Sequence, residues 1–238
     1  MLELKNVTLA ALACKDVKAT IKAMEYSMKN VKFGDAVFVS HKKPSYLPEN
    51  IRFEYTSENK SIDDFNYKMV FDFHKYINTD YCLLVHADGF VVNPDMWRDE
   101  FLDYDYIGAP WPLPAEEDKI SYRDPDGNIC RVGNSVSIRS KKLLEYPSKV
   151  NMPWEPFHGN FHEDGFICCH HHKDFEAAGM KIAPINVAKY FSHENMIPEI
   201  EGIKPFCFHK WMGTNSKYPR FCKFESFINK LKKSVLKK

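Results

Sequence analysis

Short apolar runs and segments of helical period alternate along the first ninety residues, and this alternation constrains the fold more than any other feature of the sequence. Strand-like runs occur at residues 7–13, 35–40, 51–55 and 81–86, and apolar residues recur at helical spacing in 17–28 and 63–77. This order predicts an α/β fold with a mostly parallel sheet flanked by helices. In such sheets ligands bind beyond the carboxyl ends of the strands.

The composition excludes several classes of protein. With 44% hydrophobic and 27% charged residues, the chain resembles neither a disordered nor a collagen-like protein. No window approaches the roughly 18 apolar residues of a membrane span, and the first residues show no signal-peptide profile, so we expect a cytoplasmic protein. The seven cysteines include no CxxC pair, which indicates reduced and mostly buried thiols.

The charge is distributed unevenly. Residues 223–238 contain six lysines and one glutamate, a net charge of +5, so the rest of the chain carries −4 of the formal total of +1. The apolar residues of this segment recur at helical spacing, namely Phe224, Phe227, Ile228, Leu231 and Val235. The pattern predicts a basic amphipathic helix that lies on an anionic membrane surface, or else a terminal helix that packs on the domain. No nucleic-acid partner is expected.

The most hydrophobic predicted strand, at residues 81–86, ends at His86, Ala87, Asp88 and Gly89. A hard cation such as Mn²⁺ or Mg²⁺ prefers oxygen ligands, tolerates one imidazole and can be completed by a diphosphate. The alternative is that Asp88-Gly89 is a turn and His86 a core histidine. The sequence contains neither GxGxxG nor GxxxxGK[ST], so the usual phosphate-binding loops are not indicated.

Two carboxylates, Glu163 and Asp164, precede a predicted helix that runs to Ala178. Acidic residues are favourable at a helix N-terminus, so both could simply cap this helix. Alternatively, one of them is a general base that takes a proton from an acceptor hydroxyl.

Two further candidates lie among aromatic residues. His209 is bracketed by aromatics at residues 206–211, which favours packing unless the fold returns it to Asp88. Trp111 ends an aromatic segment at residues 104–112, and such side chains can stack on sugar rings.

Four segments together resemble a known family: HADGFVVNPDMWRDEFLDYDYIGAPWP (86–112), VGNSVSIRSKKLLE (132–145), HEDGFICC (162–169) and KIAPINVAKYFSHE (181–194). They resemble bacterial and large-DNA-virus glycosyltransferase-like domains that are similar to GT-A glycosyltransferases, including the chlorovirus rhamnosyltransferase domain. The resemblance covers about residues 5–212. It implies one GT-A-like domain over 1–222, with a Rossmann-like half for a nucleotide-sugar and a second half for the acceptor, followed by the helix at 223–238.

The resemblance also implies roles for individual residues. GT-A enzymes typically hold Mn²⁺ or Mg²⁺ on the donor diphosphate with an Asp-x-Asp, and the matching tripeptide here, at residues 86–88, lacks the first acid. The implied metal ligands are therefore Asp88 and His209, and Asp164 is the implied catalytic base. The remaining implied contacts are to the nucleotide-sugar, from Ala13, Cys14, Lys15, His86, Ala87 and Asp88, and to the acceptor, from Trp111, Gly133, Asn134 and Glu163.

The resulting expectation is an inverting glycosyltransferase, hexosyl- or deoxyhexosyl-transferring, that moves a sugar from a nucleoside-diphosphate sugar to a hydroxyl of a growing surface glycan. The acceptor would be a capsule, lipopolysaccharide or glycoprotein glycan, free or lipid-linked, at the inner face of a membrane. Two alternatives remain: a metal-dependent nucleotide-sugar hydrolase or nucleotidyltransferase, and a non-catalytic glycan-binding module.

Overall fold

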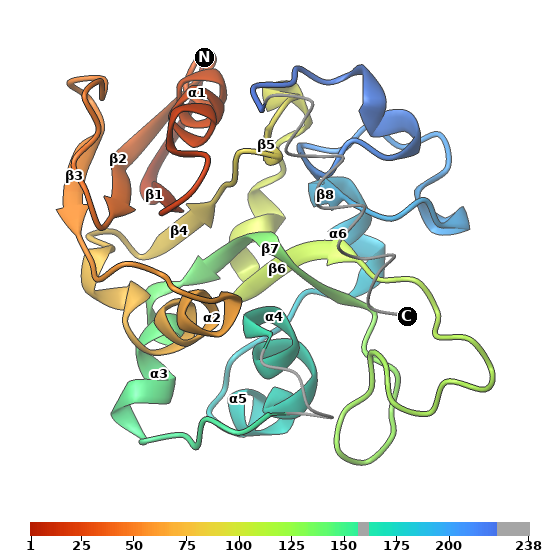
Figure 1. Cartoon of the computed structure of the whole chain (residues 1–238). Coiled ribbons are helices and arrows are strands. Elements are labelled where there is room, and N and C mark those ends of the chain that lie inside the picture. Colours follow the sequence, from red (N-terminus) through yellow and green to blue (C-terminus); the bar gives the residue numbers. More distant parts are fainter. Residues whose placement is uncertain (157–161, 223–238) are drawn as a thin grey trace.

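A six-stranded sheet forms the centre of the computed structural model, which describes residues 1–156 and 162–222 (Figure 1). The strand order is β3-β2-β1-β4-β7-β6. β1 pairs in parallel with β2 and β4, β2 pairs in parallel with β3, and β7 runs antiparallel to β4 and β6. The mostly parallel sheet predicted from the sequence is therefore confirmed. Its strands are β1 (Leu2–Leu12), β2 (Val31–Ser40), β3 (Arg52–Tyr55), β4 (Tyr81–Leu84), β6 (Tyr106–Pro110) and β7 (Val132–Ser140).

Helices and a second, smaller sheet surround the central sheet (Figure 1). The small sheet has the order β5-β9-β8, with β5 (Gly89–Val91), β9 (Cys207–His209) and β8 (Ser192–His193). The helices are α1 (Val17–Ser27), α2 (Ile62–Phe71), α3 (Lys141–Lys149), α4 (Glu163–Gly165), α5 (His172–Ala177) and α6 (Ile185–Phe191). Short 3₁₀ turns occupy Phe73–Tyr76, Pro94–Met96, Asp99–Asp103, Pro198–Ile200 and Gly213–Lys217.

Alternate residues of β1 enter two different hydrophobic clusters. Leu9 and Ala11 pack in the cluster that contains residues of α1, whereas Ala10 and Leu12 pack in the cluster that contains residues of α2. Successive side chains of a strand point to opposite faces, so both faces of β1 are covered. This double burial explains why the strand reads as a continuous apolar run rather than as an alternating one.

Two predicted helices are shorter than their sequence pattern suggested. The helix expected at 63–77 ends at Phe71, and a 3₁₀ turn follows in which Phe73 and Tyr76 both reach the core, because residues three apart align in that geometry. The helix expected after Glu163 and Asp164 and running to Ala178 begins already at Glu163, and it is divided into α4, a π-helical turn at Phe166–His170, and α5. The segment is helical as predicted but not continuous.

An irregularity in the pairing of β6 with β7 shapes the edge of the sheet where the site lies. The register shifts between Ile107 and Ala109, and a Cβ atom on Gly108 would stand 1.8 Å from the backbone oxygen of Gly133. Asn134 has a φ of 92°, in the left-handed region that disfavours side chains. Such bulges are common next to functional sites, where they re-aim a side chain.

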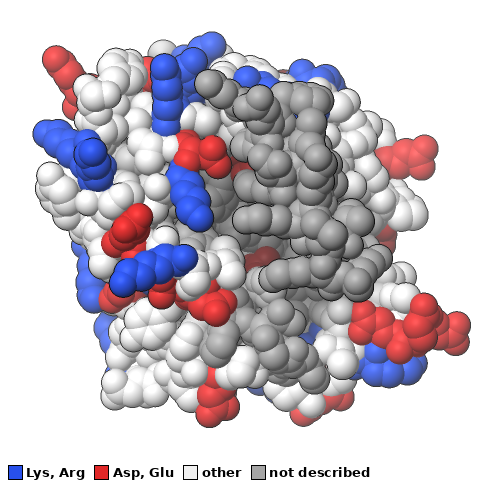
Figure 2. Space-filling model, viewed as in Figure 1, with Lys and Arg blue, Asp and Glu red and all other residues white. Residues whose placement is uncertain are grey.

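Acidic and basic side chains are interspersed over the described surface visible in Figure 2. Among those residues the view shows no continuous basic stripe of the kind that binds nucleic-acid phosphates. No helix within 1–156 and 162–222 is long and apolar enough to cross a bilayer. The basic amphipathic helix predicted at 223–238 lies outside the described residues.

Candidate active site

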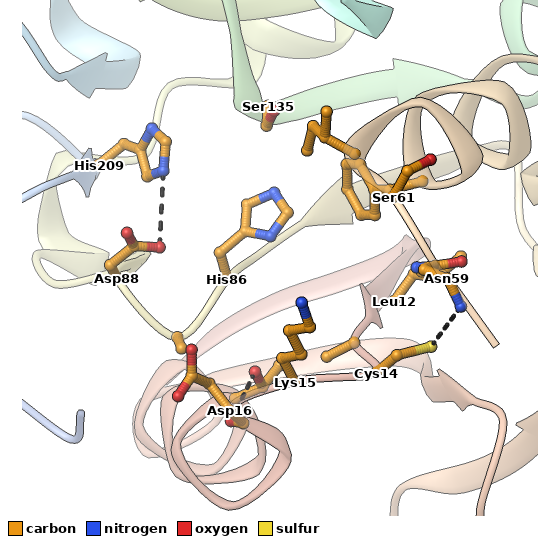
Figure 3. Close-up of a pocket in the computed structure, with 15 residues that line it drawn as sticks. Leu12, Cys14, Lys15, Asp16, Asn59, Ser61, His86, Asp88, Ser135 and His209 are labelled. Atoms are coloured by element: carbon orange, nitrogen blue, oxygen red, sulfur yellow. Dashed lines mark hydrogen bonds and ion pairs between the residues drawn. The ribbon is translucent and has the colours of Figure 1, made fainter. Parts of the chain in front are cut away.

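A cavity of about 420 Å³ opens beyond the carboxyl ends of β1 and β4, the edge at which parallel sheets bind ligands (Figure 3). The residues expected to contact a nucleotide-sugar all line this donor cavity, together with the predicted metal ligand: Ala13, Cys14, Lys15, His86, Ala87, Asp88 and His209. The structure thus brings together segments that are more than a hundred residues apart in sequence.

Asp88 and His209 meet because β5 pairs antiparallel with β9, which places Gly89 opposite His209. His209 Nε2 lies 3.6 Å from Asp88 Oδ1, and on its other side Nδ1 lies 3.2 Å from Glu194 Oε1. Burial alone would lower the pKa of His209, but these two carboxylates outweigh it and raise the pKa to about 9. Burial would likewise raise the pKa of Glu194, yet His209 and Lys210 lower it to about 2.

His86 forms the floor of the donor cavity between two other rings. Its ring centre lies 5.8 Å from that of His209 and 5.9 Å from that of Phe65. Burial lowers the pKa of His86 to about 4, so the imidazole is neutral at pH 7. Its Nε2 atom is buried and has no hydrogen-bond partner among the described residues. A buried polar atom in this state is energetically costly.

The possible metal ligands in this cavity suit a divalent cation that takes few ligands from the protein. Among residues 1–156 and 162–222 no three His, Cys, Asp or Glu side chains are grouped to hold a metal ion. Asp88 and His209 nevertheless lie side by side, and a cation that displaced the proton of His209 would find one carboxylate oxygen and one imidazole nitrogen there. Mg²⁺ and Mn²⁺ sites commonly combine one or two such ligands with waters and substrate phosphates. The residues therefore fit a cation whose coordination a diphosphate would complete.

A second cavity, of about 450 Å³, contains Asp164 on its wall. The carboxylate is held in place by two backbone donors, because Gly165 N donates to Oδ1 at 2.8 Å and Asn134 N donates to Oδ2 at 3.1 Å. Burial raises the pKa of Asp164 to about 6, and the charge of Glu163 adds to the effect. A carboxylate with a pKa close to the working pH is suited to act as a general base.

Of the four residues expected on the acceptor side, only Trp111 lines this second cavity. Glu163 is 1% exposed, and Arg139 Nη2 and Ser135 Oγ both donate to its Oε1 at 3.2 and 2.5 Å. Gly133 lies beneath the indole, since a Cβ there would stand 1.8 Å from Trp111 Cζ2. Glu163 and Gly133 therefore lie behind the cavity wall and not on its surface.

Asn134 is also buried, and it supports the wall from behind in the same way. Its Nδ2 donates to Glu194 Oε2 at 2.5 Å, while its Oδ1 accepts from Val136 N. Both polar atoms of the amide thus form a hydrogen bond within the protein. The backbone N–H of the same residue is what reaches Asp164.

The wall residues of the second cavity that the sequence reasoning missed include Tyr122, Glu194 and Lys210. Trp111 is only 5% exposed, because the ring of Tyr122 lies 5.0 Å away at an interplanar angle of 34°. Tyr122 comes from the long connection between β6 and β7 and has a φ of 54°. Nothing in the local sequence signals this position, whereas Lys210 could have been found as the neighbour of His209.

The two cavities adjoin. Ser135 lines the donor cavity, while the backbone of its neighbour Asn134 contacts Asp164. Likewise His209 lines the donor cavity and Lys210 lines the second one. Consecutive residues on two segments therefore line the two cavities, which places the cavities next to each other.

The fold is that of the GT-A glycosyltransferases. It matches the crystal structure of the galactosyltransferase LgtC in complex with donor and acceptor sugar analogs, with a TM-score of 0.52 and 13% identity over 87% of each chain. It also matches an active-site mutant of LgtC, with a TM-score of 0.50 and 12% identity over 93% of this chain and 94% of that one. At such identities the likeness shows the fold alone.

Residues 46–209 match the family described as "Protein of unknown function (DUF5672)", and the chain belongs to that family. No curated protein matches the chain in sequence. The similarity to the chlorovirus rhamnosyltransferase domain stays a prediction.

Proposed function

We propose that the chain is a glycosyltransferase that moves a sugar from a nucleoside-diphosphate sugar in the donor cavity to a hydroxyl of a glycan in the second cavity. The observation that carries this proposal is the adjacency of the two cavities, one with Asp88 and His209 and the other with Asp164. A hydrolase would need no second cavity for an acceptor. A binding module would need no carboxylate held there with a raised pKa.

On the donor side, Lys15 and the pair Asp88 and His209 would bind the diphosphate. Lys15 extends into the middle of the donor cavity, between the Asp88 end and the opposite wall (Figure 3). Asp88 and His209 would hold Mn²⁺ or Mg²⁺, which would neutralise charge on the diphosphate when bound. His86 lines the same cavity next to His209.

On the acceptor side, Asp164 would act as the catalytic base in a single displacement. The acceptor hydroxyl gives its proton to Asp164, its oxygen bonds to the anomeric carbon, and the bond from that carbon to the diphosphate oxygen breaks with the electron pair leaving on the diphosphate. Such a reaction inverts the anomeric configuration. Tyr122 and the edge of Trp111 would contact the acceptor sugar, since aromatic side chains present apolar faces to sugar rings.

The acceptor we favour is a surface glycan, free or lipid-linked, built on the cytoplasmic side of a membrane. The support is the basic, amphipathic pattern of residues 223–238, which suits an anionic membrane surface. A hexosyl or deoxyhexosyl donor fits this role.

The rate of transfer should depend on pH through Asp164. A general base acts in its ionised form, so kcat/KM should rise with pH through a midpoint near pH 6 and level off above it. Below the midpoint kcat/KM should fall roughly tenfold for each pH unit. Initial rates at subsaturating donor between pH 4.5 and 8.5 measure the profile. A profile that stays flat down to pH 4.5, as the ordinary aspartate pKa near 4 would give, would contradict the assignment of the base.

A donor panel tests the function directly. The protein is mixed with Mn²⁺ and UDP-, GDP- or dTDP-sugars, and its melting temperature is measured. Formation of the nucleoside diphosphate product is then assayed with each donor. We expect one donor class at about 100 times its Kd to raise the melting temperature by roughly 5–10 °C. Asp88→Ala should reduce the rise, whereas Asp95→Ala, at an exposed surface ion pair, should not. A panel in which no donor shifts the melting temperature would overturn the proposal.

A further inference from the structure

A buried lysine lies behind the end of the donor cavity that is farthest from Asp88. Lys68 of α2 is only 7% exposed, yet no carboxylate among the described residues forms an ion pair with it. Its Nζ donates instead to the backbone oxygen of Ser57 and, at 2.7 Å, to Oδ1 of Asn59. A buried ammonium without a carboxylate partner is expensive, so its placement calls for a specific reason.

The ammonium fixes which way the amide of Asn59 points. Lys carries three donors and no acceptor, so the amide atom that faces Nζ must be the oxygen and not the nitrogen. The amide nitrogen Nδ2 is then directed elsewhere, and no described residue accepts a hydrogen bond from it. The backbone N–H of Asn59 donates to Cys14 Sγ at 3.5 Å, which ties the residue to the end of β1 (Figure 3). Asn59 therefore presents oriented amide donors at the wall of the donor cavity.

The position of Asn59 suits the base of a nucleotide. Asp88 and His209 lie at one end of the cavity, Lys15 extends between, and Asn59 lies with Cys14 and Leu12 at the other end (Figure 3). A nucleoside diphosphate whose phosphates reach Asp88 and His209 would place its base beside Asn59. The lining of the cavity also includes the apolar side chains of Leu12, Ile62 and Phe65, which suit the faces of a planar ring.

We propose that Asn59, oriented by Lys68, selects donors whose base presents a carbonyl oxygen at position 4 of a pyrimidine or position 6 of a purine, as uracil, thymine and guanine do. This inference rests on the proposed function and goes beyond it by naming the class of nucleotide. Because the amide oxygen of Asn59 stays bonded to Lys68, only its Nδ2 donor is directed at the base. This donor can bond a carbonyl oxygen, whereas the amino group of cytosine or adenine at the same place would set one donor against another. Asn59 is a specificity-determining residue, and Lys68 is a positioning residue that acts through it.

Matched nucleotide pairs test the proposal. UDP and CDP differ at position 4 of the ring, a carbonyl in one and an amino group in the other, and GDP and ADP differ in the same way at position 6. Dissociation constants are measured by calorimetry at constant Mg²⁺ with the full chain. We expect wild type to bind the carbonyl member of at least one pair about tenfold more tightly, the effect of one well-placed hydrogen bond against a mismatch.

The variants separate orientation from folding. Asn59→Asp replaces the donor by an acceptor and should abolish or reverse the preference within a pair, since the added charge acts equally on both members. Lys68→Met frees the amide to turn and should reduce the preference to within about twofold. Lys60→Met, at an exposed lysine beside Asn59, should leave it unchanged. If Lys68→Met does not fold, as judged by circular dichroism, Asn59→Asp alone decides the result.

The outcomes distinguish the two proposals. Binding of no nucleoside diphosphate at all would overturn the proposed function. Binding without a preference for the carbonyl member, or a preference that survives in Asn59→Asp, would overturn the role of Asn59 while leaving the proposed function in place.

Discussion

Replacement of Asp164 by asparagine is expected to lower the rate of sugar transfer by about 10²–10⁴-fold while leaving donor binding intact. The amide has the same shape but cannot take the proton of the acceptor hydroxyl. Donor affinity should persist because Asp164 lines the second cavity and not the donor cavity. Chromatography of the glycan product measures transfer, and calorimetry with the donor measures affinity. Proton NMR of the wild-type product reports whether the anomeric configuration is inverted.

The stability of Asp164→Asn separates loss of the base from loss of the fold. The pKa of Asp164 is raised in the folded state, so the ionised carboxylate destabilises the protein above pH 6 and this effect disappears as the pH falls below about 4. Asparagine removes this charge but offers only one oxygen to the two backbone donors, Gly165 N and Asn134 N, so the two effects oppose each other and the variant should melt within about 5 °C of wild type at pH 8. Asp126→Asn, at an exposed residue, is the matched control and should transfer at the wild-type rate. Transfer by Asp164→Asn at that rate would rule out its role as the base.

The parallel part of the sheet could be predicted because its strands are buried on both faces. A run such as residues 7–13 needs no tertiary information to be recognised as such a strand, and its carboxyl end then locates Cys14 and Lys15 at the ligand edge. The donor side of the site follows from the same rule, because Asp88 follows another buried strand. His209 could be assigned only through the resemblance, since its place depends on the pairing of β5 with β9.

The acceptor side could not be predicted to the same extent, because its walls depend on long-range geometry. Glu163 and Asp164 are adjacent residues of the same chemical type, and only the direction of the first turn of α4 turns one toward Arg139 and the other toward the cavity. The placement of Tyr122 over Trp111 depends on a loop residue at positive φ. No periodicity in the sequence reports either feature.

Replacement of Arg139 by methionine is expected to cost about 3–5 kcal/mol of unfolding free energy. Both side chains of the pair it forms with Glu163 are buried, with exposures of 0% and 1%. Burial opposes the charge on Arg139, but Glu163 outweighs it and raises the pKa of the guanidinium. Removing Arg139 would leave the carboxylate of Glu163 buried without a compensating charge. Urea unfolding followed by circular dichroism measures the loss.

A double variant shows whether the stability lost in Arg139→Met reflects the unpaired charge of Glu163 or the loss of packing. Replacing both Arg139 and Glu163 by methionine removes both charges while filling similar volume, so it should be more stable than Arg139→Met alone, because buried ion pairs can often be exchanged for apolar residues at little cost. A double variant that is less stable than the single one would show that Glu163 contributes through its bond to Ser135 instead. The charge of Glu163 helps to raise the pKa of the adjacent Asp164. Because the double variant lacks this charge, the midpoint of its pH profile for transfer should lie at a lower pH than that of wild type.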